Sequence, residues 1–294
     1  DLGSIRVTTL ASGTQTPLDK AAAIATVITA EDIEAIGATD IDQVLETVPG
    51  LHITRSDQAY SPKFVLRGIT STYNAQALML INGIPVSSLF LGNRSNIWAG
   101  MPVKAVSRIE VIRGPGSALY GADAYAGVIN IITKDRNEIS GLKAGARRGS
   151  FDTAAAWLQY GITLKNGLDA ALSLEVETTD GWKETVRSDR QSVYDRLMGT
   201  NASLAPGAVD TMKDMVEARL DIAGEHTRFR AGYQGRYNVG SGVGYFEALD
   251  HDGRTRSQRI NADYSGHWNT ADGAWLFEPR ISYFMGTQEV EKNL

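Results

Sequence analysis

The sequence contains no cysteine, which excludes disulfide bonds, thiolate metal sites and cysteine nucleophiles. It also lacks the ~20 mostly apolar residues that a membrane-spanning helix needs. The longest candidate, residues 21–30, is an alanine-rich run that contains Thr26 and Thr29. The N-terminus has neither the basic start nor the apolar core of a signal peptide, so we expect an exported protein to be represented here in its mature form. A closed β-barrel is the one membrane-spanning structure left open.

A polybasic face and catalytic motifs are missing as well. With 29 basic and 34 acidic residues among 294, the net charge is −5, and no polybasic face is available for nucleic acid. The four histidines share no metal-site spacing, and no Ser/His/Asp order or paired-carboxylate motif stands out. We therefore expect no enzymatic activity, no metal site and no cofactor. The length allows two domains.

The most informative segment is residues 106–134, VSRIEVIRGPGSALYGADAYAGVINIITK. Two runs rich in β-branched residues flank a glycine-rich connection, which predicts two strands joined by an ordered loop. The GPGSALYG stretch has some likeness to a phosphate-binding loop. However, the Lys-Ser/Thr pair is missing after the last glycine, and Leu119 stands where the dinucleotide motif requires a glycine. A nucleotide site is not expected.

This segment closely resembles the C-terminal half of the plug domain of TonB-dependent outer-membrane receptors, in which RIEVIRGP leads through LYG to GVINIITK. Three upstream segments resemble the same family in the same order: VLETVPGLHI at residues 44–53, FVLRG at residues 64–68 and LMLINGIPV at residues 78–86. The resemblance implies an N-terminal α+β plug domain followed by antiparallel strands of a transmembrane β-barrel. The implied location is the Gram-negative outer membrane.

Local patterns also predict a small α+β domain. Thr29 followed by Asp32 indicates a capped helix, and Thr39 is expected to cap a second helix. Asn82 and Gly83 between two apolar runs predict a tight hairpin, because both central residues of such a turn need a positive φ. The strands expected in this domain are residues 52–55, 63–67, 77–81, 84–87, 107–112 and 128–133.

The division of the chain that we expect has three parts. Residues 1–30 form an N-terminal segment whose apolar residues are too few for a packed element, so that it is mobile or pairs at a sheet edge. Residues 31–137 form the plug, and residues 138–294 the first part of the barrel. In this last part apolar and polar residues alternate, as in strands that face lipid on one side and a wet lumen on the other. Seven strands are predicted, at residues 139–149, 153–163, 168–178, 213–223, 227–238, 257–269 and 274–287.

The connections between these strands differ in kind. Those near residues 166, 224 and 270–273 are short, whereas residues 179–212 and 234–255 contain long polar loops. Short turns belong on the periplasmic side of such barrels. Seven strands cannot close a barrel of this type, and barrels of the resembled family have 22 strands around the plug. We expect about two thirds of the barrel to lie outside these residues.

The resemblance also implies a site for the energy-coupling partner. The segment IRVTT resembles the TonB box, an extended stretch that adds as a strand to TonB in the periplasm. It consists of Ile5, Arg6, Val7, Thr8 and Thr9. The alternative is that the segment forms a first edge strand of the plug.

Two arginines match family positions that contact the barrel. Arg67 and Arg113 each end a plug strand immediately before a glycine. The resemblance implies that they face glutamates of the barrel wall. A buried guanidinium without a carboxylate is costly, so such partners are needed. We expect those glutamates in later strands; the alternative is a pair of exposed arginines on a soluble domain.

Ligand contacts are expected from the plug loops that face outward and from the external loops of the barrel. The candidates are Tyr60, Tyr73, Phe90, Arg94 and Trp98, of which the last three have the aromatic and cationic character that suits an anionic or aromatic iron chelate. Generic loop chemistry explains the same residues.

The function implied by the resemblance is active import of a large scarce nutrient, with a ferric siderophore favoured. The implied partners are TonB with the ExbB/ExbD inner-membrane motor, the ligand and outer-membrane lipid, and the barrel is expected to be monomeric. Haem, cobalamin or another ligand of the same family remains an alternative. Two other classes remain as well: a receptor that signals to a periplasmic partner, and a soluble binding fragment without transport.

Overall fold

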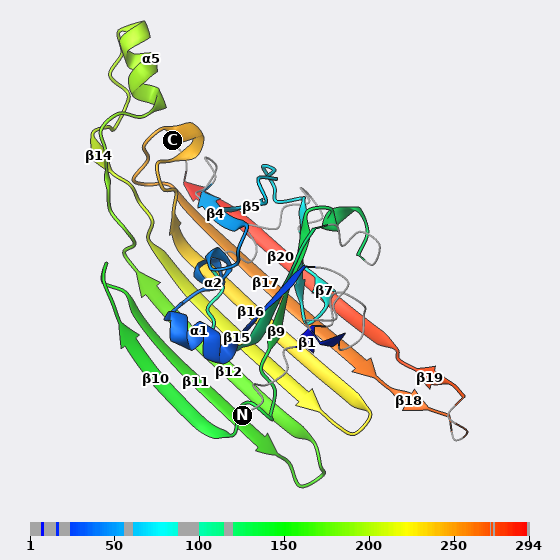
Figure 1. Cartoon of the computed structure of the whole chain (residues 1–294). Helices are drawn as coiled ribbons and strands as arrows, with labels where there is room; N and C mark the ends of the chain where they lie inside the picture. The colour runs from blue at the N-terminus through cyan, green and yellow to red at the C-terminus, as the bar shows by residue number, and fades with distance from the viewer. Residues whose placement is uncertain are drawn as a thin grey trace.

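The computed structural model describes residues 7–8, 16–17, 24–55, 61–87, 100–114, 120–270, 272 and 274–292. It has two parts: an N-terminal body of short helices and strands, and a long curved sheet, called the wall here, against which the body lies (Figure 1). Within the described residues, no helix is both long enough and apolar enough to cross a membrane.

The N-terminal body contains two short helices. α1 (Ala30–Ile36) starts at a capping box in which Thr29 and Asp32 satisfy each other's backbone N–H, and it ends at Gly37 with φ 74°. α2 (Ile41–Glu46) is capped by Asp40, whose carboxylate accepts from the N–H of Gln43 at 3.0 Å. The expectation that Thr39 caps this helix is wrong, because its hydroxyl accepts instead from the Gln43 side chain.

The main sheet of the body has the strand order β3-β8-β9-β6-β7. Its members are β3 (Ala25–Thr29), β8 (Val106–Arg113), β9 (Gly127–Thr133), β6 (Ala77–Ile81) and β7 (Ile84–Pro85), and only the β6–β9 pair is parallel. β4 (Leu51–Arg55) and β5 (Pro62–Leu66) pair with each other in a separate two-stranded antiparallel sheet. The Asn82-Gly83 hairpin is confirmed, since both residues have positive φ, 51° and 79°.

The edge-pairing alternative for residues 1–30 holds for β3, which pairs along β8 at the edge of the main sheet. The burial of its Val27 and Ile28 was not expected. Five residues with only two buried apolar side chains leave little periodicity to detect. The strand exists because β8 offers it an open edge.

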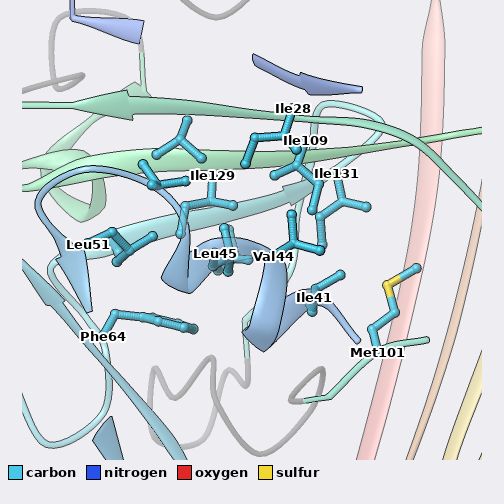
Figure 2. Packing of buried hydrophobic residues seen from close by; sticks show 14 of the residues in the cluster. Ile28, Ile41, Val44, Leu45, Leu51, Phe64, Met101, Ile109, Ile129 and Ile131 are labelled. Atoms are coloured by element: carbon cyan, nitrogen blue, oxygen red, sulfur yellow. The ribbon is translucent and has the colours of Figure 1, made fainter. Parts of the chain in front are cut away.

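The hydrophobic core lies between α2 and the main sheet (Figure 2). Ile41, Val44 and Leu45 project from α2 toward Ile109 of β8 and Ile129 of β9, and all five are fully buried. Burying one such side chain contributes about 1.5–3 kcal/mol. The core therefore fixes α2, and with it Asp40, relative to the sheet.

The wall is a seven-stranded antiparallel sheet in which every strand pairs with its neighbours in sequence. Its strands are β10 (Gly141–Arg148), β11 (Ala154–Thr163), β12 (Asp169–Thr179), β15 (Lys213–Ala223), β16 (Thr227–Gly240), β17 (Arg254–Gly266) and β20 (Arg280–Lys292). The predicted alternation is confirmed with the polar set inside. On β12, Glu175 is 1% exposed while its neighbours Leu174 and Val176 are 40% and 42% exposed. The wall buries charge against the body and turns apolar residues outward.

The last predicted strand, residues 274–287, is wrong in its bounds. β18 (Trp268–Asn269) and β19 (Leu276–Phe277) form a small hairpin of their own, and β20 begins only at Arg280. Pro279 separates them, because proline has no N–H to continue a strand ladder.

The long connections lie together at one end of the wall. Between β12 and β15 the chain forms β13 (Thr185–Val186), α5 (Arg190–Met198) and β14 (Gly207–Ala208), and between β16 and β17 it forms the 3₁₀ turn η3 (Tyr245–Glu247). These two connections are called the long connections below. The short turns at the opposite end include Gly167, with φ 82°.

Candidate functional site

The surface between the N-terminal body and the wall is the best-defined candidate site, because buried charges from both parts meet there. Lys213 of β15 places its ammonium 3.3 Å from Asp40, the cap of α2, and 3.7 Å from Glu177 of β12. Arg147 of β10 binds the same Glu177 and lies 3.0 Å from Glu175. Asp40, Glu175 and Glu177 are therefore each paired with a cationic side chain.

The loop before β8 makes the second set of contacts. The backbone N–H of Lys104 donates to Glu175 at 3.0 Å, and its carbonyl accepts from Gln159 of β11 at 2.7 Å. Its ammonium lies 4.6 Å from the ring centre of Trp157 and 3.8 Å from Glu34 of α1. One loop residue thus joins two wall strands to the body.

A third set of contacts lies nearer the short turns. Arg228 of β16 bridges Asp221 at 2.7 Å and Asp135 of the body at 3.1 Å. Arg280 of β20 donates to the carbonyl of Asn82, in the tight hairpin, at 2.7 Å. These contacts are ion pairs and hydrogen bonds, so the described surface between the body and the wall is mostly polar. An exception is Phe284 of β20, which packs against the body's core.

A cavity of about 340 Å³ opens between the body and the wall near the long connections. Asp42, Arg55 and Lys213 line it, with Arg55 3.1 Å from Asp42. Burial raises the pKa of Asp42 despite that arginine. Burial alone would raise the pKa of Asp40 too, but Lys213 and the Gln43 N–H outweigh it, so the pKa of Asp40 lies below its ordinary value.

The arginines predicted to reach the barrel make their described contacts within the body. Arg113 donates to the carbonyl of Pro49 at 2.6 Å and to the hydroxyl of Thr26 at 3.1 Å. Arg67 has φ 51° and its guanidinium lies beside Gly114. Their contact with later barrel strands remains a prediction.

Most of the other predicted site residues lie outside the described residues. Of the TonB-box candidate, Ile5, Arg6 and Thr9 lie outside, while Val7–Thr8 form β1 and pair with β2 (Thr16–Pro17). Of the ligand candidates, Tyr60, Phe90, Arg94 and Trp98 lie outside. Tyr73 sits in a turn before β6 and is 38% exposed. No group of three or more metal-ligating side chains occurs among the residues that the structure describes.

Sequence reasoning missed the residues that join the two parts. Lys104, Lys213 and Asp40 belong to no motif, and their partners are up to 173 positions away. Asp135 directly follows the GVINIITK segment, where the chain leaves the body for the wall, so its position could have suggested a contact with the wall.

The geometry is that of a small domain held inside a curved wall, and comparison with known families decides its identity. Residues 17–128 match the family described as TonB-dependent Receptor Plug Domain. By this match the chain carries the plug domain of the TonB-dependent receptors. Its N-terminal body is the plug, and the predicted combination of an α+β plug with antiparallel barrel strands is confirmed.

Curated relatives among the TonB-dependent receptors include vitamin B12 transporters. The chain is 36% identical over 154 residues to BtuB of Vibrio vulnificus strain CMCP6, which covers 50% of this chain and 24% of that protein. It is 33% identical over 170 residues to BtuB of Photobacterium profundum, which covers 56% of this chain and 27% of that protein. The chain thus spans about a quarter of the length of these relatives.

Solved structures of TonB-dependent receptors share the fold. The ferric yersiniabactin uptake receptor FyuA from Yersinia pestis matches with a TM-score of 0.64 at 19% identity, covering 91% of this chain and 41% of that one. The alcaligin outer membrane receptor FauA from Bordetella pertussis matches with a TM-score of 0.67 at 17% identity, covering 96% and 42%. At such identities the likeness concerns the fold alone.

Proposed function

We propose that this protein takes part in TonB-dependent import of a large scarce nutrient across the Gram-negative outer membrane. The main support is the polar surface between plug and wall. Asp40, Lys104 and Asp135 hold the plug through ion pairs and hydrogen bonds that water can replace. Such contacts let a plug remain seated at rest and still shift under force, which import of a large ligand requires.

The cargo that we favour is a ferric siderophore. Solved structures with this fold include receptors named for yersiniabactin, alcaligin and enterobactin. The alternative is cobalamin, since the curated relatives named above are vitamin B12 transporters. Haem is a third possibility. Tyr60, Tyr73, Phe90, Arg94 and Trp98 remain our candidates for ligand contact.

Energy coupling is assigned to the segment from Ile5 to Thr9. Strand addition needs a backbone that takes up the extended conformation, and Val7–Thr8 already do so against β2. We propose that TonB, driven by ExbB/ExbD, pairs with this segment and pulls on residues 1–30 to rearrange the plug of residues 31–137 within the barrel that begins at residue 138.

An uptake assay tests this function. A strain lacking the gene, complemented with the native gene, should accumulate radiolabelled ferric siderophore, and should fail to do so when TonB is absent or residues 5–9 are deleted. Uptake of labelled cobalamin in place of iron would overturn the choice of cargo. Equal uptake with and without TonB would overturn the proposed function itself.

A further inference from the structure

The two long connections pack against each other and enclose a cavity of about 570 Å³ to which the plug contributes no lining residue. α5, at the top of Figure 1, forms one side of it, and η3 forms the other. A volume of this size is typical of a small-molecule site. It is separate from the 340 Å³ cavity between plug and wall, with which it shares no residue.

Hydrogen bonds hold the two sides of this cavity in place. The carboxylate of Asp189 accepts from the N–H of Ser192 in α5, from the hydroxyl of Ser203 and, across the cavity, from the N–H of Leu249, each at 2.7 Å. Arg190 and Glu247 form an ion pair at 3.2 Å between the same two connections. The cavity is therefore preorganised by contacts that a ligand does not have to supply.

Three aromatic side chains, Tyr194, Tyr245 and Phe246, are part of its lining. Tyr194 and Phe246 are 46% and 62% exposed, so both offer ring surface to an occupant. Phe246 has φ 56°, a left-handed conformation that is strained for a bulky residue and persists only when its surroundings enforce it. Tyr245 is half-buried, and its hydroxyl has no hydrogen-bond partner among the residues described. It is free to donate to an occupant.

The charge of the two connections selects against anions. Residues 180–212 and 241–253 together contain eight acidic and four basic side chains. Arg190, a cation that lines the cavity, is already paired with Glu247. An anionic occupant would meet a negative field without a free cation, whereas a neutral ring avoids this cost and a cationic ring gains attraction to the aromatic faces.

We propose that this cavity is a binding subsite for a flat aromatic group that is neutral or cationic. Tyr194 and Phe246 supply ring contact, and the Tyr245 hydroxyl donates a hydrogen bond to an acceptor on the group. The subsite rests on the proposed function only in taking the long connections as the end that meets the cargo.

Three naphthalene probes of similar size test the charge preference: 2-naphthol, (2-naphthylmethyl)trimethylammonium and 2-naphthoate. Binding to the purified protein in detergent is followed by saturation-transfer NMR titration. We expect the neutral and cationic probes to bind at least tenfold more tightly than 2-naphthoate. Equal or tighter binding of 2-naphthoate would overturn the proposal.

Variants locate the binding. Tyr194→Ala and Phe246→Ala should each weaken 2-naphthol about fivefold, in line with the loss of one aromatic pair. Tyr194→Phe, which keeps the ring, should bind normally and shows that the fold tolerates change there. Tyr245→Phe should weaken 2-naphthol, which can accept a hydrogen bond, and leave the trimethylammonium probe unchanged.

Leu197→Ala is the matched control, because Leu197 lies on α5, is 76% exposed and does not line the cavity. It should leave all three affinities unchanged. Probe affinities that ignore the cavity variants, or that fall equally in Leu197→Ala, would overturn the subsite. Probe binding needs neither TonB nor transport. If the native gene supports no TonB-dependent uptake while the purified protein binds the three probes as expected, the proposed function is overturned and the subsite stands.

Discussion

At the scale of the residue, the lysine between plug and wall lowers the pKa of the carboxyl group of Asp40. Lys213 sits on Asp40 and Glu177 in a mostly buried setting. The pKa of Asp40 is lowered from 3.8 in spite of burial, so its contribution to stability is present above pH ~3.8 and is lost as the pH falls through the folded pKa. Asp42 behaves in the opposite sense, because burial raises its pKa.

Replacing Lys213 by methionine should therefore raise the pKa of Asp40, since burial then acts without its main opponent. The loss of this charged contact should weaken the attachment of α2 to the wall by about 1–3 kcal/mol. Carboxyl-labelled NMR across a pH titration measures the pKa, and hydrogen exchange of the Gln43 amide measures the loosening. Lys183→Met removes an ammonium from an exposed pair with Asp180 and should change neither. An unchanged pKa of Asp40 in Lys213→Met would show that Lys213 does not stabilise its carboxylate.

A second prediction at this scale concerns Asp189. Burial alone would raise its pKa, but hydrogen bonds from Ser192, Leu249 and Ser203 lower it to about 2. Because the folded pKa is lowered, Asp189 contributes fully to the stability of the fold above pH ~3.8, and this contribution is lost as the pH falls through about 2.

Asp189→Asn should speed hydrogen exchange at the Leu249 amide at neutral pH, because the neutral amide group cannot accept on both of its terminal atoms. Asp252→Asn, in the same connection, should leave that amide protected. Equal exchange in both variants would show that Asp189 does not join the two connections.

At the scale of the element, strong local signals predicted the structure well. The capping box of α1, the Asn82-Gly83 hairpin and the alternation on β12 each depend on neighbouring residues, and each was found where expected. Boundaries were less reliable. β20 started later than expected because of Pro279. The bounds of β3 were not predicted, only that residues 1–30 are mobile or pair at an edge, because a five-residue strand depends on the edge that receives it.

The two helix starts allow a paired test. Thr29→Ala removes the side-chain acceptor of the α1 cap and should destabilise that helix by about 1 kcal/mol, seen as faster hydrogen exchange at the Asp32 and Ile33 amides. Thr39→Ala removes only a contact with the Gln43 side chain and should have a smaller effect on α2. If Thr39→Ala destabilised α2 more than Thr29→Ala destabilises α1, Thr39 would be the cap of α2 after all.

At the scale of the whole molecule, the wall is inverted relative to a soluble sheet. Its polar residues face the plug, and its apolar residues face outward, as expected for a surface in contact with lipid. The two cavities differ in character: ion pairs line the plug–wall cavity, whereas the cavity of the long connections also has aromatic rings in its lining.

An arginine at Leu174, in the middle of β12, should therefore cost about 2–4 kcal/mol if the wall spans a bilayer. The folded fraction of the protein in lipid vesicles, read from its heat-modifiable mobility, measures this cost. Leu197→Arg places the same charge on the exposed surface of α5 and should fold normally. An unchanged folded fraction in Leu174→Arg would argue against a lipid-facing wall.

The sequence by itself determined the family, the α+β plug, the number and order of the seven wall strands and the alternation that assigns their two faces. These features depend on turn chemistry, side-chain period and motifs, all of which are local in the chain. Only the tertiary structure decided which charges meet across the plug–wall surface, where Arg113 donates and how the long connections form a cavity. Such contacts join residues as far apart as Asp40 and Lys213, and no local pattern records which distant carboxylate a cation will meet.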